Sequence, residues 1–171
     1  LINPGGRLSI YQELGNKLAA IEPPIWTGLM ATFMRTKGYR VDVLDSNALD
    51  LAPEEVAEIV EKRKPLLAAV IVYGHQPSAS TQVMPSCGLI CKAIHERCAD
   101  AKTILVGGHA ATLPELTLEQ EDVDFVCTGE GPYTLADLVD ALREPAPNLD
   151  AVRGIVYMKD GAVQRTAAAP L

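Results

Sequence analysis

The chain has 171 residues, of which 48% are hydrophobic and 22% are charged, and its formal net charge at pH 7 is −7. These values are typical of a globular domain with a core of its own, and an acidic balance without a basic cluster argues against nucleic-acid or anionic-membrane partners. No apolar run reaches the roughly 18 residues of a membrane span and no signal peptide is visible, so we expect a cytoplasmic protein.

Five short apolar segments predict β-strands. They cover residues 1–3, 39–44, 66–73, 103–106 and 123–127. Because a strand is already under way at Leu1, we expect residues to precede it. The first strand is followed by a long loop over residues 4–24, and loops of that length in compact domains are usually functional or mobile.

Helices are predicted between the strands, over residues 24–37, 53–64, 114–120 and 134–143. A further helix begins at Ser80 or Pro85 and runs to Ala99. Pro24 and Pro114 suit a first helical turn, and the acidic start and basic end of the helix over 53–64 match the helix dipole. Near the end of the chain, residues 154–158 and 162–166 flank Asp160-Gly161, which is a strong hairpin signal.

Alternating strands and helices predict an α/β fold, a flavodoxin-like or Rossmann-like three-layer sandwich. We expect a five-stranded parallel sheet in the order 2-1-3-4-5, with a C-terminal β-hairpin besides. The predicted division places an α/β domain at residues 1–145. Residues 146–171 would hold the hairpin and the start of a linker to a further domain.

Glycine-rich or polar loops follow four of the predicted strands. In an open parallel sheet, ligands bind at the carboxyl ends of the strands, so these loops are the candidate site. The glycines could also serve turn geometry alone, a simpler interpretation that stays open. The candidate binding residues are Asn3, Pro4, Gly5, Tyr73, Gly74, His75, Gln76, Gly107, Gly108, His109, Thr128, Gly129 and Glu130.

The other reactive side chains favour structural roles. Cys87, Cys91 and Cys98 share one helix stripe, and partner ligands for a metal are absent, so we expect free buried thiols. His95 lies in mid-helix beside Glu96 and is expected on a solvated face. The sequence contains no phosphate-binding GxxxxGK[ST] loop, no GxGxxG after the first strand and no GxSxG elbow.

Six pieces in a fixed order carry a family resemblance. They read LINP, EPPIWTGLMATFMRTKGYRVDVLDSNAL, VIVYGHQ, ILVGGHAATLPE, DFVCTGEGPYTL and GIVYMKDGAVQRT. Through them, nearly the whole chain resembles the cobalamin-binding (B12-binding) N-terminal domain of cobalamin-dependent radical S-adenosylmethionine enzymes. The resemblance implies a corrin ring over the strand ends and a nucleotide tail threaded between sheet and helices. Gly107 and Gly108 would give that tail room, and the loop over residues 73–78 would line the tail or the lower face of the corrin.

The chain departs from that family's patterns in two places, which concern the cobalt ligand and the iron–sulfur cluster. The usual cobalamin domain has a D-x-H-x-x-G motif whose His ligates cobalt, whereas here the first strand leads into Asn3-Pro4-Gly5-Gly6-Arg7. This implies cobalamin bound His-off, with His75 and His109 bonding to nearby backbone instead. Cys87 and Cys91 match the first two cysteines of the C-x-x-x-C-x-x-C pattern that binds an iron–sulfur cluster, but the third position is occupied by Ile94.

The missing cluster pattern implies that S-adenosylmethionine and a 4Fe–4S cluster belong to a missing C-terminal radical S-adenosylmethionine domain. The chain alone is then expected to bind and not to catalyse, while the intact enzyme would perform methyl transfer, or cyclase-type or related radical chemistry. An exposed apolar rim around Tyr11, Ile25 and Trp26 should face that domain.

Two alternatives stay open. A flavodoxin-like domain could bind FMN or another nucleotide, although the loop after the first strand has Gly5, Gly6 and Arg7 where Ser and Thr phosphate donors are expected. A docking domain that has kept the fold and lost the ligand is the other alternative.

Overall fold

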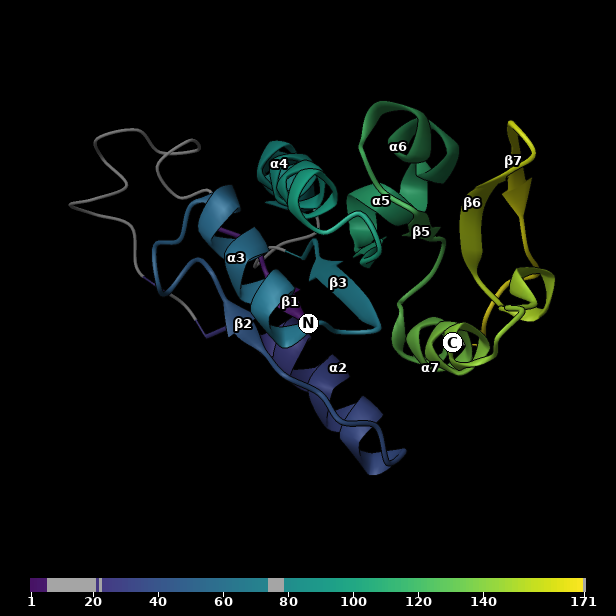
Figure 1. Cartoon of the computed structure of the whole chain (residues 1–171), viewed down its shortest axis with the longest axis horizontal. Coiled ribbons are helices and arrows are strands. Elements are labelled where there is room, and N and C mark those ends of the chain that lie inside the picture. The colour runs from purple at the N-terminus through teal and green to yellow at the C-terminus, as the bar shows by residue number, and fades with distance from the viewer. Residues whose placement is uncertain (6–20, 22, 74–78, 171) are drawn as a thin grey trace.

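One twisted sheet runs through the molecule (Figure 1). The computed structural model describes residues 1–5, 21, 23–73 and 79–170, and within them the sheet has seven strands in the order β2-β1-β3-β4-β5-β6-β7. The strands are β1 (Ile2–Asn3), β2 (Leu44–Asp45), β3 (Leu67–Ile71), β4 (Lys102–Val106), β5 (Phe125–Cys127), β6 (Ile155–Lys159) and β7 (Ala162–Arg165).

The predicted parallel order 2-1-3-4-5 is confirmed, but the prediction of a five-stranded sheet is wrong. The hairpin continues the sheet, because β6 pairs antiparallel with β5 at Val126↔Val156 and β7 pairs with β6. The Asp160-Gly161 signal is local and does not say which strand the hairpin pairs with. Pairing there covers the edge that β5 would otherwise expose, which is a common physical reason for such additions.

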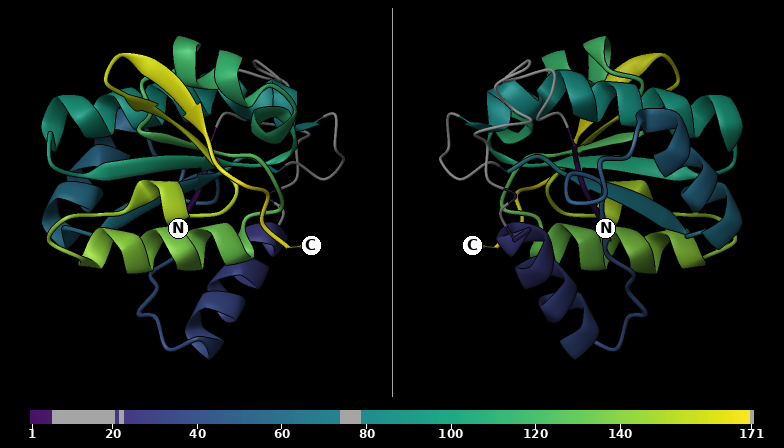
Figure 2. Two further views of the ribbon diagram at one scale, coloured as in Figure 1. Left: turned by 90° about the vertical axis from the view of Figure 1, so that its right-hand side faces the viewer. Right: turned by 90° about the vertical axis from the view of Figure 1, so that its left-hand side faces the viewer.

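Helices cover both faces of the sheet (Figure 2). One face carries α3 (Pro53–Arg63), α4 (Ala79–Arg97), α5 (Gly108–Thr112) and α6 (Pro114–Gln120), and the other carries α2 (Ile25–Thr36), α7 (Pro132–Arg143) and the 3-10 turn η1 (Leu149–Ala151). Alternate residues of the strands enter two separate cores. Val70 and Leu105 pack under α4, whereas Ala69 and Ile104 pack against α2 and α7.

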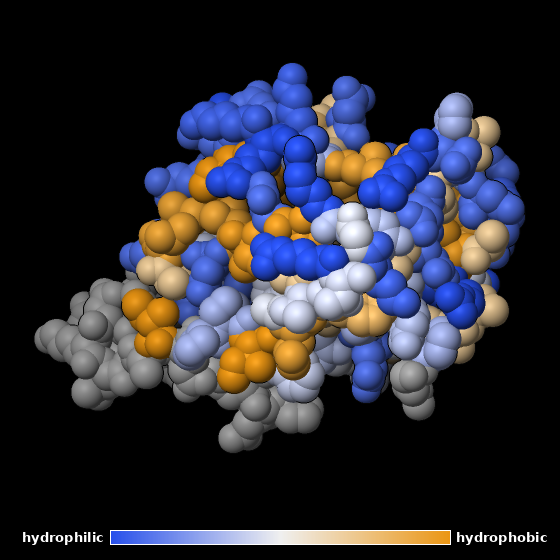
Figure 3. Space-filling model, turned by 90° about the horizontal axis from the view of Figure 1, so that it is seen from below, coloured by the Kyte–Doolittle hydropathy of each residue, from blue (hydrophilic) through white to orange (hydrophobic). Residues whose placement is uncertain are grey.

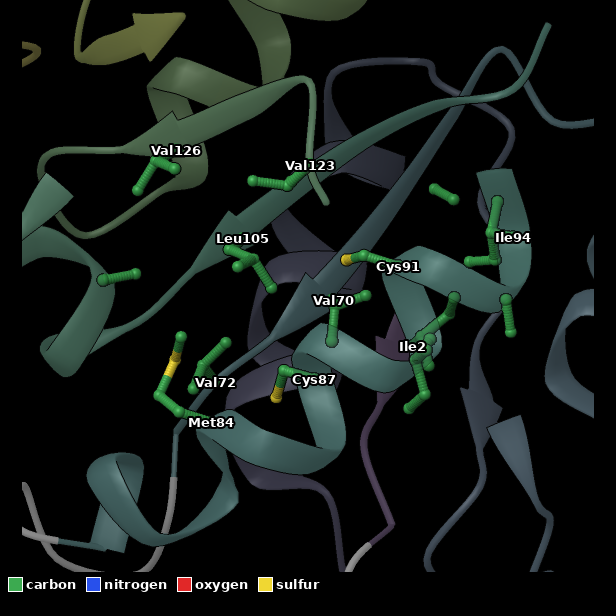
Figure 4. Packing of buried hydrophobic residues seen from close by; sticks show 14 of the residues in the cluster. Ile2, Val70, Val72, Met84, Cys87, Cys91, Ile94, Leu105, Val123 and Val126 are labelled. Carbon is green, nitrogen blue, oxygen red and sulfur yellow. The ribbon is translucent and has the colours of Figure 1, made fainter. Parts of the chain in front are cut away.

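The core under α4 is tightly closed (Figure 4). Cys87, Cys91 and Ile94 of α4 meet Val70 and Leu105 of the sheet, and all five residues are fully buried. Burial of this apolar surface is the main source of the domain's stability. The same packing fixes the position of α4 over the strands, and so fixes where its first turn lies.

Element boundaries differ from the predictions in three places. The strand expected over residues 39–44 is short because β2 pairs only with β1, from Ile2↔Leu44 onward. α4 begins at Ala79 and continues through Pro85. The helix α5 was not predicted, because its residues Gly108–Thr112 read as an exit loop. No helix in the described part of the chain is long and apolar enough to cross a membrane.

Candidate functional site

The candidate site is the edge of the sheet at which β1, β3, β4 and β5 end. We call the residues that follow these strands, 3–5, 72–73, 107–109 and 128–131, the exit edge. Parallel pairing at Ile2↔Val70, Ile71↔Val106 and Leu105↔Val126 brings the four strand ends together. Every predicted binding residue that the structure describes belongs to this edge, while Gly74, His75 and Gln76 lie outside the described residues.

Hydrogen bonds from β2 hold the exit of β1. The Asn3 side-chain amide donates to Asp45 Oδ1 at 2.8 Å. The Gly5 amide donates to the Ser46 hydroxyl at 2.8 Å, and that hydroxyl donates to the Asn3 carbonyl at 2.7 Å. Ser46 is fully buried. Asp45 and Ser46 were not among the predicted site residues, because their role depends on partners more than 40 residues away.

The two neighbouring glycines at the end of β4 have different surroundings. A Cβ on Gly107 would lie 2.1 Å from the carbonyl oxygen of Val72, so the chain after β3 passes directly over this residue. Among the described residues, a Cβ on Gly108 would meet only the Ser80 hydroxyl, at 3.4 Å. Gly107 therefore serves close backbone packing, the simpler of the two interpretations, whereas Gly108 leaves open space at the first residue of α5.

The first turn of α4 contacts the loop after β4. The His109 amide donates to the Ser80 hydroxyl at 3.1 Å, and His109 Nδ1 lies 3.0 Å from Thr81 Oγ1. His109 was expected to bond to nearby backbone; this is wrong, because its ring bonds to a side chain of α4. Ser80 is buried and was not among the predicted residues. Its role could not be predicted from its position at the start of a helix, because that role depends on its contact with His109, 29 residues further along the chain.

The exit of β5 is anchored on one side and open on the other. The Thr128 amide donates to the Gly154 carbonyl at 2.9 Å, and the Cys127 thiol donates to the Gly129 carbonyl at 3.4 Å. A Cβ on Gly129 would have no heavy atom of the described residues within 4 Å. Gly131 has φ +105°, and a Cβ there would lie 2.5 Å from Val106 Cγ1. This loop thus requires a glycine for its turn and presents bare main chain next to it.

An aromatic pair adjoins these loops. The rings of Trp26 and Tyr73 stack with centroids 5.0 Å apart and an interplanar angle of 28°. Trp26 is 47% exposed and Ile25 is 63% exposed, which confirms the predicted exposure of both residues. Tyr11, the third residue of the predicted rim, lies outside the described residues.

The cysteines behave as structural residues. Cys87 and Cys91 are free and fully buried, and burial raises the pKa of both thiols, as predicted for inert core cysteines. Cys98 follows α4, and its thiol donates to the Ala57 carbonyl at 3.9 Å. Among the described residues, no group of three or more His, Cys, Asp or Glu side chains could hold a metal ion.

His95 lies near the start of β4, at the end of the strand opposite the exit edge. The prediction that it lies on a solvated face is wrong. Its Nδ1 lies 2.8 Å from Asp122 and its Nε2 lies 3.0 Å from Asp124. Partial burial opposes the charged ring, but the two carboxylates outweigh it and raise the pKa of His95. The Thr103 backbone amide and the Lys102 ammonium each donate a hydrogen bond to the Asp124 carboxylate, both at 2.8 Å. Every polar group of this cluster has a protein partner.

The structure also has a cavity of about 350 Å³ that does not belong to the exit edge. Leu1, Leu67 and Ala69 line it from the amino-terminal ends of the strands, and Arg63 and Val139 line it from the helices on either side. None of the predicted binding residues lines it, so it is not the candidate site. The exit edge itself offers main chain, small side chains and an aromatic surface, which suits binding by shape rather than acid–base chemistry.

Comparisons with known proteins agree with this geometry. A family model described as "B12 binding domain" matches residues 12–139. An uncharacterized methyltransferase of Pyrococcus horikoshii, PH0819, is 27% identical over 150 residues, which is 87% of this chain and 31% of the relative. Anaerobic magnesium-protoporphyrin IX monomethyl ester cyclase of Rubrivivax gelatinosus is 27% identical over 165 residues, which is 94% of this chain and 28% of the relative. The chain therefore spans less than a third of the length of these relatives.

Two solved structures share the fold. One is TsrM, a radical S-adenosylmethionine methyltransferase of Kitasatospora setae with cobalamin and a [4Fe-4S] cluster bound. It has a TM-score of 0.72 and 21% identity over 91% of this chain and 28% of its own. The other is OxsB, a cobalamin-dependent S-adenosylmethionine radical enzyme with aqua-cobalamin and S-adenosylmethionine bound. Its TM-score is 0.67, with 21% identity over 93% of this chain and 21% of its own.

Proposed function

Since this chain belongs to the B12-binding domain family, we propose that its exit edge binds cobalamin as one module of a radical S-adenosylmethionine enzyme. The observation that carries the proposal is the family match over residues 12–139, on a sheet whose strand ends present open main chain. FMN, the alternative ligand, has no comparable support from the family. A docking domain without ligand differs from the proposal in one measurable property, the retention of cobalamin.

The residues present fit a large ring with a tail. Among the described residues, Gly108 and Gly129 leave open space where other residues would project a side chain, and the nearest atom to a Cβ on Gly5 is the Ser46 carbonyl oxygen at 3.5 Å. Buried Ser80 lies next to Gly108, where it can hold the main chain of a tail-binding groove in place. Cobalamin supplies cobalt–carbon chemistry when bound, and the role of this chain is to bind and orient it.

We further propose that the cobalt has no protein histidine ligand. The residues after β1 lack the histidine of the D-x-H-x-x-G motif. Bound cob(II)alamin should then show no nitrogen superhyperfine splitting from imidazole in its electron paramagnetic resonance spectrum. Splitting that disappears in His75→Ala or His109→Ala would contradict this part of the proposal.

The catalytic parts are assigned to a separate radical S-adenosylmethionine domain, with residues 146–171 leading toward it. The proposal is supported by the chain's coverage of less than a third of its relatives and by the third cluster position, which is Ile94. The isolated chain should form no 5′-deoxyadenosine from S-adenosylmethionine, even after iron–sulfur reconstitution under reducing conditions. Catalytic amounts of 5′-deoxyadenosine would contradict the assignment. In the intact enzyme we expect methyl transfer or related radical chemistry.

Cobalamin retention tests the proposal most simply. The chain is incubated with hydroxocobalamin or, in parallel, with FMN, and then desalted and examined by absorption spectroscopy. We expect close to one equivalent of retained cobalamin and no FMN. Retained FMN would favour the nucleotide alternative, and retention of neither by a natively folded chain would favour the docking domain.

A further inference from the structure

The stacked pair of Trp26 and Tyr73 is unusual in its exposure. Trp26 is the second residue of α2, and Tyr73 lies two residues beyond the end of β3. The rings stack at 5.0 Å, yet 47% of the Trp26 surface stays accessible. A tryptophan contributes most when it is buried, so a fixed, half-exposed indole at a strand-exit edge indicates a binding surface.

Contacts of the β5 exit loop hold both members of the pair in place. The Tyr73 hydroxyl lies 3.5 Å from the Glu130 carbonyl, which joins the exits of β3 and β5. A Cβ on Gly131 would lie 3.1 Å from Met30 Cε, so the β5 exit loop packs closely against α2. Met30 is buried in the core below. The pair therefore has little freedom to rearrange, and a preorganised surface binds with a smaller entropic cost.

The surroundings of the pair are apolar and open. Ile25, which precedes Trp26 in α2, is 63% exposed. Seen from the side on which α2 lies, the molecule shows hydrophobic atoms at its surface between hydrophilic ones (Figure 3). β3 lies between β1 and β4 in the sheet, so Tyr73 stands beside the middle of the exit edge.

We propose that the Trp26–Tyr73 pair is the platform against which the corrin macrocycle of cobalamin lies. This assignment rests on the proposed function and adds two named contact residues to it. A corrin is a broad, nearly flat conjugated ring, and the indole offers a rigid flat surface of the same character. Contact between them removes apolar area from water on both partners, and aromatic contacts add to that gain. The competing role for this surface is contact with the missing domain alone.

The isolated chain separates the two roles, because no second domain is present to contact the pair. Trp26 is the single tryptophan of the sequence, so its fluorescence reports on this position alone. Hydroxocobalamin absorbs where tryptophan emits, and we expect saturable quenching of the wild-type chain on titration. The apparent Kd from this curve should agree with the Kd from equilibrium dialysis.

Equilibrium dialysis of variants with hydroxocobalamin then tests the platform. Trp26→Ala should raise the Kd about tenfold or more, the scale expected when an aromatic contact and its buried area are lost. Trp26→Phe retains a ring and should stay within about threefold of the wild type. Leu29→Ala removes an equally exposed apolar side chain from the same helix and should leave the Kd unchanged.

A wild-type Kd for Trp26→Ala, with native circular dichroism, would overturn the platform while leaving the proposed function standing. Equal losses in Trp26→Ala and Leu29→Ala would also overturn it, because the effect would then belong to α2 as a whole. Lack of binding by the wild-type chain would overturn the proposed function and the platform together. If Trp26→Ala does not fold, the Kd values of Trp26→Phe and Tyr73→Leu are compared instead. The platform predicts a clearly higher Kd for Tyr73→Leu than for Trp26→Phe. A Tyr73→Leu Kd equal to that of the wild type would overturn the platform.

Discussion

The two ends of β4 show how differently polar and small residues are used in this domain. At its start, Thr103 and the cluster of His95, Asp122 and Asp124 satisfy one another, and Lys102 adds an ion pair. At its end, Gly107 packs against the Val72 carbonyl, and Gly108 next to it adjoins open space among the described residues. Polar side chains saturated by protein partners stabilise the fold, whereas unfilled space at a strand exit is available to a ligand.

Gly107→Ala should have the largest effect and break the fold at the exit end. Its Cβ would lie 2.1 Å from the Val72 carbonyl oxygen, and backbone cannot move as a flexible side chain can. Overpacking typically costs about 1–3 kcal/mol, and with rigid backbone opposite we expect about 3 kcal/mol, a large part of a domain's stability. Thermal unfolding followed by circular dichroism would measure it. A midpoint within a few degrees of the wild type would show that β3 and β4 are less closely packed here.

Gly108→Val should leave the fold intact and remove cobalamin binding. Among the residues that the structure describes, the new Cβ would meet only the Ser80 hydroxyl, so the added side chain enters the space we assign to the cofactor. We expect at least about a hundredfold weaker retention, which corresponds to roughly 2.7 kcal/mol. Ala162→Val, on exposed β7, adds similar bulk at the far edge of the sheet and serves as the control. Native unfolding with unchanged retention would contradict the role of Gly108.

Asp124→Asn tests the closed end of β4. The carboxylate accepts bonds from Lys102, His95 and the Thr103 amide, and together these lower the pKa of Asp124 despite its partial burial. Removing the charge should destabilise the domain by on the order of 2 kcal/mol in denaturant unfolding, without a change in cobalamin affinity. Asp122→Asn, at a more exposed carboxylate, should cost less than about 1 kcal/mol. Equal costs would show that Asp124 is not the centre of the cluster.

The smallest effect is a pH dependence from His95. Its pKa is raised in the folded protein, so its contribution is fully present below the unfolded value of about 6.5 and is lost as pH rises through the folded pKa. Asp124 has the opposite sign, because its lowered pKa contributes above about 4 and is lost on acidification. Denaturant midpoints from pH 5 to 9 should decline on the alkaline side, and His95→Gln should flatten that decline. A decline that persists in His95→Gln would contradict the assignment.

The sequence predicted most of the fold because its signals were local. Buried strands such as residues 66–73, helix starts at Pro24 and Pro114, and the Asp160-Gly161 turn all depend on nearby residues. The features that were missed depend on long-range contacts. The pairing of β5 with β6 joins residues about 30 positions apart, and the His95 cluster joins α4 to the residues before β5.

The candidate site was predictable to a similar degree. The glycine-rich exits were visible in the sequence, but the difference between Gly107 and Gly108 was not, because it is set by the path of the chain after β3. Ser80 and Thr81 were missed because their partner, His109, lies 28 or 29 residues away. The stack of Trp26 on Tyr73 likewise joins a helix to a distant strand exit.

Hydrogen–deuterium exchange with and without cobalamin tests most directly the claim that the two ends of β4 have different roles. The account predicts slower exchange with cobalamin for amides near Tyr73, at Gly108–Thr112, at residues 128–131 and in the first turn of α2. Amides at Thr103 and Asp124 should exchange at the same rate in both samples. Protection confined to the amino-terminal ends of the strands, or no protection at the exit edge in a saturated sample, would contradict it.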